Sequence, residues 1–253
     1  MAGSKKYWVD FVEKDDRDMY GYTLIEGFPG MGLVGTIAAK YLVEKLGFEQ
    51  TGHIDSNAFV PIIRIHEGRP VHPSRIYVNS QKKLVAIVSE QLIPQNLVWL
   101  FAKELVDWIE DKGIERVVSL AGIKADDAKG GEKIYGMASN RKAGEFLEKN
   151  GIEIINEGIT TGVNALIMLD LKDKDIQAVS ILGKVQISAD YKAAASLLRK
   201  LDEMIGLKLD VEPLMKEAKE TEKALLSHLE AMKKTGDEIK KLEDKTVQTP
   251  MFS

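Results

Sequence analysis

The sequence predicts an α/β fold in which a mixed sheet is flanked by helices. Short aliphatic runs alternate with longer amphipathic runs, and this alternation is typical of a sheet covered by helices on both faces. Residues 83–90 and 116–123 are almost continuously apolar, as strands buried on both faces are. Strand candidates between residues 60 and 90 follow each other with short turns. This spacing indicates antiparallel pairing there, and therefore a mixed sheet.

The individual elements follow the hydrophobic periodicity. Strands are predicted at residues 22–26, 61–66, 75–80, 83–90, 116–123 and 176–185. Helices are predicted at residues 34–46, 95–112, 140–150, 162–170 and 190–206. The second helix has one apolar face, formed by residues that recur at helical spacing: Leu97, Leu100, Phe101, Leu105, Trp108 and Ile109.

The composition limits the classes of protein to which this chain can belong. The chain has 253 residues, of which 44% are hydrophobic, enough to form a core. The net charge of −4 gives no basic footprint, so we expect no nucleic-acid partner. No apolar run approaches the roughly 20 residues that span a bilayer, and the N-terminus lacks a secretory signal. We therefore expect a cytoplasmic protein without a membrane partner.

The chain contains no cysteine, which excludes disulfides, thiol nucleophiles and thiolate metal sites. Charged residues make up 29% of the sequence, mostly Lys and Glu. Together these features favour a thermophilic source.

The stretch "GFPGMGLVG" contains Gly30, Gly32 and Gly35 in a G-x-G-x-x-G pattern between a strand and a helix. Such a loop can hold a pyrophosphate at a helix N-terminus, and Asp55 lies about 20 residues further on, where a ribose-binding acid is expected. Against this, Glu26 at the end of the strand would repel phosphate. The other interpretation is that glycine permits a tight turn and close packing of the helix on the sheet.

Other candidate chemistry is sparse. Asp126 and Asp127 follow a buried strand, where paired carboxylates can bind Mg²⁺ or transfer protons, or simply form a polar connection. Pro70 and Pro73 interrupt the stretch that contains His66 and His72, and the spacing of these histidines matches no helical metal pair. No G-x-S-x-G nucleophile motif is present. We expect no catalytic, cofactor or metal site.

The composition changes after Asp210, and a heptad pattern follows. We divide the chain into an α/β domain at residues 1–210, a long C-terminal helical segment at residues 211–244 and a flexible docking tail at residues 245–253. The helix either packs on its own domain or forms an oligomer interface. Its large apolar heptad positions are Leu214, Leu225, Met232, Ile239 and Leu242.

The last residues of the sequence include an aromatic side chain. Pro250 ends any helix, and Met251 and Phe252 then lie beside the carboxylate of Ser253. A chain-terminal carboxylate next to an aromatic side chain is a known mode of capture by a partner. The alternative is an end that packs on its own surface.

Several blocks in order resemble one family across roughly residues 20–210. They are "GFPGMGLVGTIAAKYL", "HIDSNAFVPIIRI", "SRIYV", "LVAIVSEQLIP", "VVSLAGI" and "EGITTGVNALIML". They are similar to the archaeal branch of the proteasome assembly chaperone 2 family. The resemblance implies a fold similar to nucleoside phosphorylases without their catalytic site. It also implies homo-oligomers with ATP-independent chaperone action on 20S proteasome α subunits, and no enzyme activity.

The resemblance also suggests a role for the tail. Some relatives end in a hydrophobic residue, a Tyr and any last residue, and this motif inserts into pockets between proteasome α subunits. The matching positions here are Met251, Phe252 and Ser253. Phe in place of Tyr loses a hydroxyl hydrogen bond of about 1 kcal/mol, and several tails on one oligomer would compensate. The rival function is a nucleoside- or nucleotide-binding enzyme that uses the Gly-rich loop.

Overall fold

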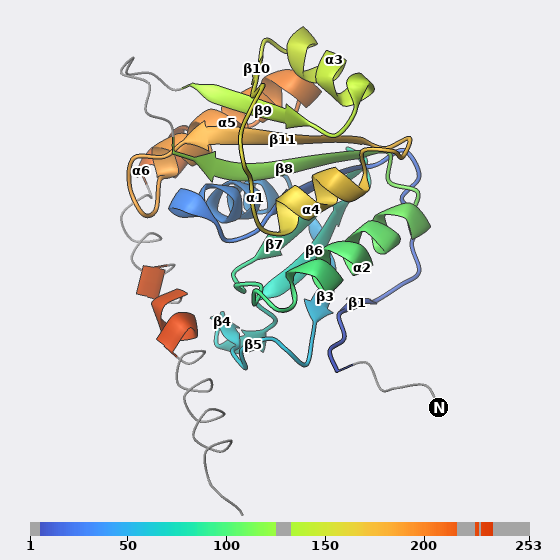
Figure 1. Cartoon of the computed structure of the whole chain (residues 1–253). Coiled ribbons are helices and arrows are strands. Elements are labelled where there is room, and N and C mark those ends of the chain that lie inside the picture. The colour runs from blue at the N-terminus through green and yellow to red at the C-terminus, as the bar shows by residue number, and fades with distance from the viewer. Residues whose placement is uncertain (1–5, 125–132, 217–225, 228, 235–253) are drawn as a thin grey trace, which may run out of the picture.

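A nine-stranded mixed sheet forms the centre of the molecule (Figure 1). The computed structural model describes residues 6–124, 133–216, 226–227 and 229–234. Across the sheet the strand order is β1-β3-β6-β7-β2-β8-β11-β9-β10. These strands are β1 (Asp10–Glu13), β2 (Thr23–Gly27), β3 (Glu49–Asp55), β6 (Ser74–Asn79), β7 (Leu84–Ser89), β8 (Arg116–Ile123), β9 (Ile134–Ala138), β10 (Glu153–Ile154) and β11 (Gln177–Lys184).

The middle of the sheet is parallel and its flanks are mostly antiparallel. Strands β7, β2, β8 and β11 run parallel to one another. On one side β6, β3 and β1 continue with antiparallel pairings, and on the other β9 is antiparallel to β11. The predicted mixed sheet is confirmed, as is the antiparallel pairing of the strands at residues 74–79 and 84–89.

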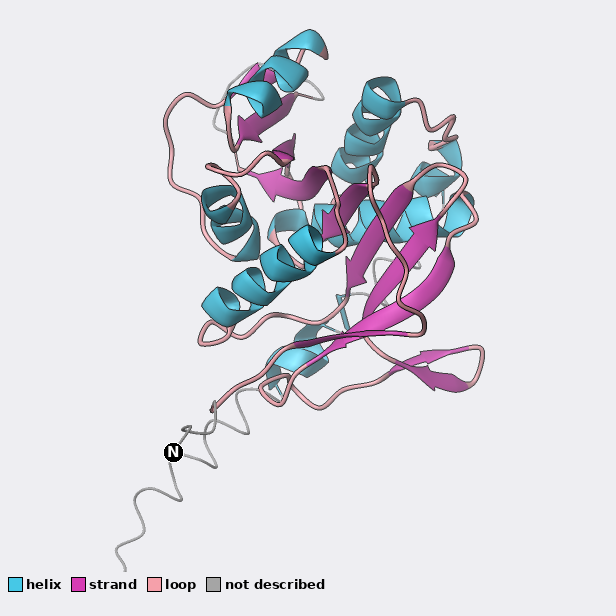
Figure 2. Ribbon diagram, turned by 90° about the vertical axis from the view of Figure 1, so that its right-hand side faces the viewer, coloured by secondary structure: helices cyan, strands magenta, loops and turns pink. Residues whose placement is uncertain are grey.

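The prediction of a sheet strand at residues 61–66 was wrong in part. Only β4 (Arg64–His66) is extended there, and it pairs with β5 (Arg69–Val71) in a separate hairpin, apart from the large sheet (Figure 2). Pro61 has no N–H to donate to a ladder. Glu67 and Gly68 both adopt positive φ, at 49° and 72°, as the tight turn of a two-residue hairpin requires.

The five predicted helices are confirmed, with ends shifted by a few residues. A single 3₁₀ turn, η1 (Met31–Leu33), precedes the first of them. The helices are α1 (Val34–Lys45), α2 (Val98–Asp111), α3 (Arg141–Lys149), α4 (Val163–Asp170), α5 (Tyr191–Ile205) and the short α6 (Glu212–Lys216). Asn140 and Asp190 cap α3 and α5, because each side chain accepts a hydrogen bond from the backbone N–H three residues on.

Two apolar layers cover the two faces of the sheet. Helices α1, α3 and α5 pack on one face, while α2 and α4 pack on the other, in front of the sheet in Figure 1. Successive strand residues point to opposite faces. Val117 therefore joins the α2/α4 layer and Val118 the α1/α5 layer. Burial on both faces explains why the central strands read as continuous apolar runs. The likeness to nucleoside phosphorylases stays a prediction.

The C-terminal segment contacts the body of its own subunit in its described part. Leu214, Leu229 and Met232 are buried in the same apolar layer as α1 and α5. Leu226 packs against that layer as well. The heptad positions Leu225, Ile239 and Leu242 lie outside the described residues. Among the described residues no helix is both long and apolar enough to cross a bilayer.

Met232→Ala tests this anchoring. Met232 is 1% exposed, so truncation leaves a cavity and should lower the free energy of unfolding by about 2 kcal/mol or more. Lys233→Ala, on the exposed side of the same segment, is the control and should change it by less than about 0.5 kcal/mol. Guanidinium unfolding measures both. Equal stabilities of the two variants would show that the segment does not dock.

Candidate functional site: a cavity at the carboxyl edge of the sheet

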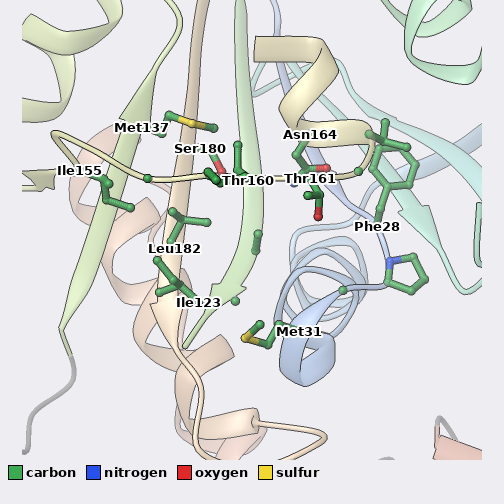
Figure 3. Close-up of a pocket in the computed structure, with 18 of the residues that line it drawn as sticks. Phe28, Met31, Ile123, Met137, Ile155, Thr160, Thr161, Asn164, Ser180 and Leu182 are labelled. Carbon is green, nitrogen blue, oxygen red and sulfur yellow. The ribbon is translucent and has the colours of Figure 1, made fainter. Parts of the chain in front are cut away.

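A cavity of about 680 Å³ opens where the parallel strands β2, β8 and β11 end or approach their ends (Figure 3). In open α/β sheets, ligands bind outside the carboxyl ends of the strands. The lining comes from the loop after β2, the segment before and at the start of α2, the end of β8, β9, β11 and the loop that leads into α4. In residue numbers these are 28–31, 92–93, 98, 121–123, 137, 155–164, 180 and 182.

The loop after β2 turns sharply to reach α1. Gly32 and Leu33 both adopt positive φ, at 63° and 52°, and for Leu33 this conformation is strained. The Gly32 carbonyl accepts a hydrogen bond from the Asp190 N–H at 2.8 Å. This bond ties the turn to the N-terminus of α5. Residues 28–31 are therefore held as a fixed wall of the cavity.

The glycines of the G-x-G-x-x-G pattern serve backbone packing. A Cβ on Gly35 would lie 2.1 Å from the Leu120 carbonyl oxygen, and a Cβ on Gly27 would lie 2.1 Å from the Gly35 carbonyl oxygen. A Cβ on Gly32 would lie 2.6 Å from Val185. Protein atoms thus fill the approach to Gly32 and Gly35. Of the three glycines in the pattern, Gly30 lines the cavity and has open surroundings.

The acidic residues weighed with this loop do not join it. Asp55 ends β3, which is separated from β2 by β7 and β6, so it does not lie where a ribose-binding acid is needed. Asp126 and Asp127 lie outside the described residues. Asp55 therefore cannot act as the ribose-binding acid that the dinucleotide interpretation of the loop requires.

Glu26 differs from the sequence-based interpretation. Instead of facing a phosphate site as an anion, it is fully buried in the middle of the sheet. Neither carboxyl oxygen has a hydrogen-bond partner of good geometry among the described residues. Burial raises the pKa of Glu26 to about 8, and the nearby Ser119 hydroxyl and Phe28 backbone offset this only in part. At neutral pH the carboxyl group therefore holds a proton.

Glu26 is one end of a polar row across the sheet. It lies opposite Ser119 on β8, and Ser119 lies opposite Ser180 on β11. Side chains of directly opposed residues share one face of a sheet. Ser119 is fully buried and its hydroxyl is also unpartnered, whereas Ser180 lines the cavity. The row leads from the cavity wall to the buried carboxyl group.

The comparisons with known proteins identify the family. The model of the PAC2 family matches residues 24–228. This chain belongs to the PAC2 family. The crystal structure of Pyrococcus furiosus PbaA, an archaeal homolog of proteasome-assembly chaperone, is 31% identical with a TM-score of 0.80, over 89% of this chain and 98% of that one.

Two further relatives have a similar extent. The Methanocaldococcus jannaschii protein MJ0106 is 31% identical over 235 residues, which are 91% of this chain and 96% of that protein. Pyrococcus furiosus PbaB, an archaeal proteasome activator, shares the fold with a TM-score of 0.72 at 22% identity, over 87% of this chain and 98% of that one. The resemblance to the proteasome assembly chaperone 2 family is thereby confirmed.

A second polar group, formed by the charged side chains of Arg64, Arg75 and Glu90, has a structural role in this domain. Arg75 is 3% exposed, and its Nη1 and Nη2 each lie 3.2 Å from Glu90 Oε2. Arg64 of the β4–β5 hairpin binds the other oxygen of the same carboxylate. Two guanidinium groups thus share one buried anion, and they tie the hairpin to the sheet.

The three described histidines, His53, His66 and His72, do not gather around a common point. His66 is exposed on β4, whereas the ring of His72 stacks on His53 with 3.6 Å between centroids. This pairing could not be predicted from the sequence, because His53 and His72 are far apart in the chain. No group of three or more His, Cys, Asp or Glu in the described part of the chain is placed to hold a metal ion.

Gly35→Ala and Gly30→Ala form a matched pair that tests the packing role of the loop. The first places a methyl group into the Leu120 carbonyl and should lower the free energy of unfolding by about 3 kcal/mol, or prevent folding. The second lies in extended backbone with open space and should change it by less than about 1 kcal/mol. Chemical unfolding of both proteins measures this. A tolerated Gly35→Ala would contradict the packing role.

Glu26→Gln tests the buried proton. The carboxyl pKa is raised from 4.5 to about 8 on folding, so the folded chain holds a proton that the unfolded chain releases between these values. The contribution of Glu26 to the stability of the wild-type protein is therefore complete below pH 4.5 and is lost as the pH rises toward 8. The slope from this one group is at most about 1.4 kcal/mol per pH unit.

Glutamine cannot ionise, so the variant should lack this slope. Urea unfolding at pH 5.5, 6.5 and 7.5 should show wild type losing stability relative to the variant at each step. Parallel pH profiles would mean that the Glu26 carboxyl is already ionised in the folded protein.

Proposed function

We propose that this protein is a non-enzymatic, ATP-independent assembly chaperone or adaptor that acts on 20S proteasome α subunits as a homo-oligomer in the cytoplasm. The observation that carries the proposal is the match to Pyrococcus furiosus PbaA, at 31% identity over 89% of this chain with a TM-score of 0.80. That structure is described as an archaeal homolog of proteasome-assembly chaperone.

The loop geometry supports independence from ATP. Phosphate binding at a glycine-rich loop needs open backbone N–H groups at the helix N-terminus. Val185 and the Leu120 carbonyl group instead fill the space beside Gly32 and Gly35. Within the part of the chain that the structure describes, the cavity next to this loop has no Lys or Arg in its lining to neutralise a triphosphate.

In this proposal the C-terminal tail carries the contact. Met251 and Phe252 supply apolar anchoring, and the carboxylate of Ser253 supplies the charge; all three lie outside the described residues. Burial of Leu229 and Met232 supports a tail-presenting role for the helical segment, because it anchors the residues that precede the tail in sequence on the domain. Several tails on one oligomer raise the affinity through effective concentration.

Tail variants test the proposal in a binding assay with immobilised 20S α subunits. Deletion of residues 251–253 should abolish binding, while native mass spectrometry still shows a homo-oligomer. Phe252→Tyr should strengthen binding about fivefold per tail, because the added hydroxyl group contributes a hydrogen bond of about 1 kcal/mol. Gln248→Ala, in the same tail, is the control and should bind like wild type.

The same assay separates the rival functions. Addition of ATP should leave the dissociation constant unchanged, and a large ATP effect would favour a nucleotide-dependent protein. Binding that survives deletion of residues 251–253 would refute the tail as the docking element. Binding that survives this deletion and is lost when the oligomer dissociates would assign the contact to another surface of the oligomer.

A further inference from the structure

We propose that the cavity at the carboxyl edge of the sheet is a binding site for an uncharged small molecule with an apolar body and one polar group that faces Ser180. This inference goes beyond the proposed function and does not depend on it. It would give the PAC2 domain a ligand as well as a protein partner.

Size and position support a small-molecule site. A volume of about 680 Å³ lies within the range of roughly 300–1,000 Å³ that is usual for small-molecule pockets. The lining segments are distant in sequence, and the fold brings them together at the ends of the central parallel strands. The tight turn at Gly32 and Leu33 fixes one wall of the cavity.

The chemistry of the walls sets the class of ligand. Large apolar side chains form most of the lining, among them Phe28, Val98, Met137 and Leu182. Among the described lining residues Glu157 alone is charged, and it is exposed to solvent. A charged ligand would lose its hydration here without gaining a counter-ion. The cavity therefore favours an uncharged molecule.

Polar side chains at one end of the cavity set the orientation. Figure 3 shows Ser180, Thr160 and Asn164 at the same end, away from Met31. Ser180 is only 1% exposed, so its hydroxyl group has little access to bulk water. Behind it lie the unpartnered Ser119 hydroxyl and the Glu26 carboxyl group. Ser180 is the member of this row that lines the cavity, so a polar group of the ligand is best placed to hydrogen-bond there.

Two large apolar side chains are exposed at the rim, next to the exposed polar residues Asn156, Glu157, Thr160 and Thr161. Ile159 is 97% exposed and Met31 is 51% exposed, and both line the cavity. A ligand with an apolar body that fills the cavity would cover part of this surface. The same rim also fits a peptide segment, such as the tail of this chain, and the experiment below distinguishes the two.

Methionine-methyl NMR on the full-length protein tests the site. Met31 and Met137 line the cavity, whereas Met19 and Met204 are buried elsewhere and report on the integrity of the fold. The probes are indole and cyclohexanol, which are both uncharged and carry one hydrogen-bond donor. We expect saturable shifts of the Met31 and Met137 signals, with a dissociation constant in about the millimolar range for probes of this size.

Two variants fill the cavity from different sides. Ser180→Leu extends from the floor and Asn164→Phe from the first turn of α4. Each should weaken probe binding at least tenfold, as measured by the dissociation constant from the Met137 shifts. Leu169→Phe adds an aromatic ring to the exposed outer side of the same helix and should bind the probes like wild type. Unchanged Met19 and Met204 signals confirm that each variant is folded.

Three results would overturn the proposal. One is the absence of a Met137 shift with either probe in the wild-type protein, a measurement that needs no variant. Another is a shift that persists in both folded cavity-filling variants. The third is a Met137 shift on deletion of residues 246–253 without any probe, which would assign the cavity to the tail. Proteasome binding by the wild-type chain is measured separately, so either idea can fail alone.

Discussion

The direct contact between helix α1 and the sheet is the constraint on which the rest of this domain depends. No side chain separates Gly35 from the Leu120 carbonyl or from Gly27, so the helix axis lies close to strands β2 and β8. A helix held this near the strand that precedes it requires a tight connection. Gly32 and the strained Leu33 supply that connection, and the loop before them becomes one wall of the cavity.

The same arrangement explains the state of Glu26. Strand β2 lies between β7 and β8 at the centre of the sheet, where helices cover both faces. A carboxyl group there loses its hydration, and no arginine or lysine on the neighbouring strands lies opposite it. Holding a proton is the remaining way to reduce the free-energy cost of burial. The centre of the sheet is therefore polar without being charged.

The sequence predicted the elements that have a clear apolar pattern and missed the strands near the sheet edges, whose burial is partial. Strands β7, β8 and β11 and all five longer helices were predicted, because their apolar patterns match elements buried on one or two faces. Strands β1, β3, β9 and β10 were missed. Strand β3 reads "EQTGHID", and its Gly52 is needed because a Cβ there would lie 2.5 Å from the Val12 carbonyl oxygen. The site was harder still, since Leu120 and Val185 decide what the glycine loop does, and neither is near it in sequence.

The fold separates the two surfaces that our proposals use. Leu229 and Met232 hold the C-terminal segment on the α1/α5 side of the sheet, with Leu214 in the same layer. Phe28, Val163 and Met137, which line the cavity, belong to or pack against the α2/α4 layer on the opposite side. A ligand in the cavity therefore does not compete with the anchoring of this segment. Any coupling between them has to pass through the sheet or through α1, whose first turn begins where the cavity-lining loop ends.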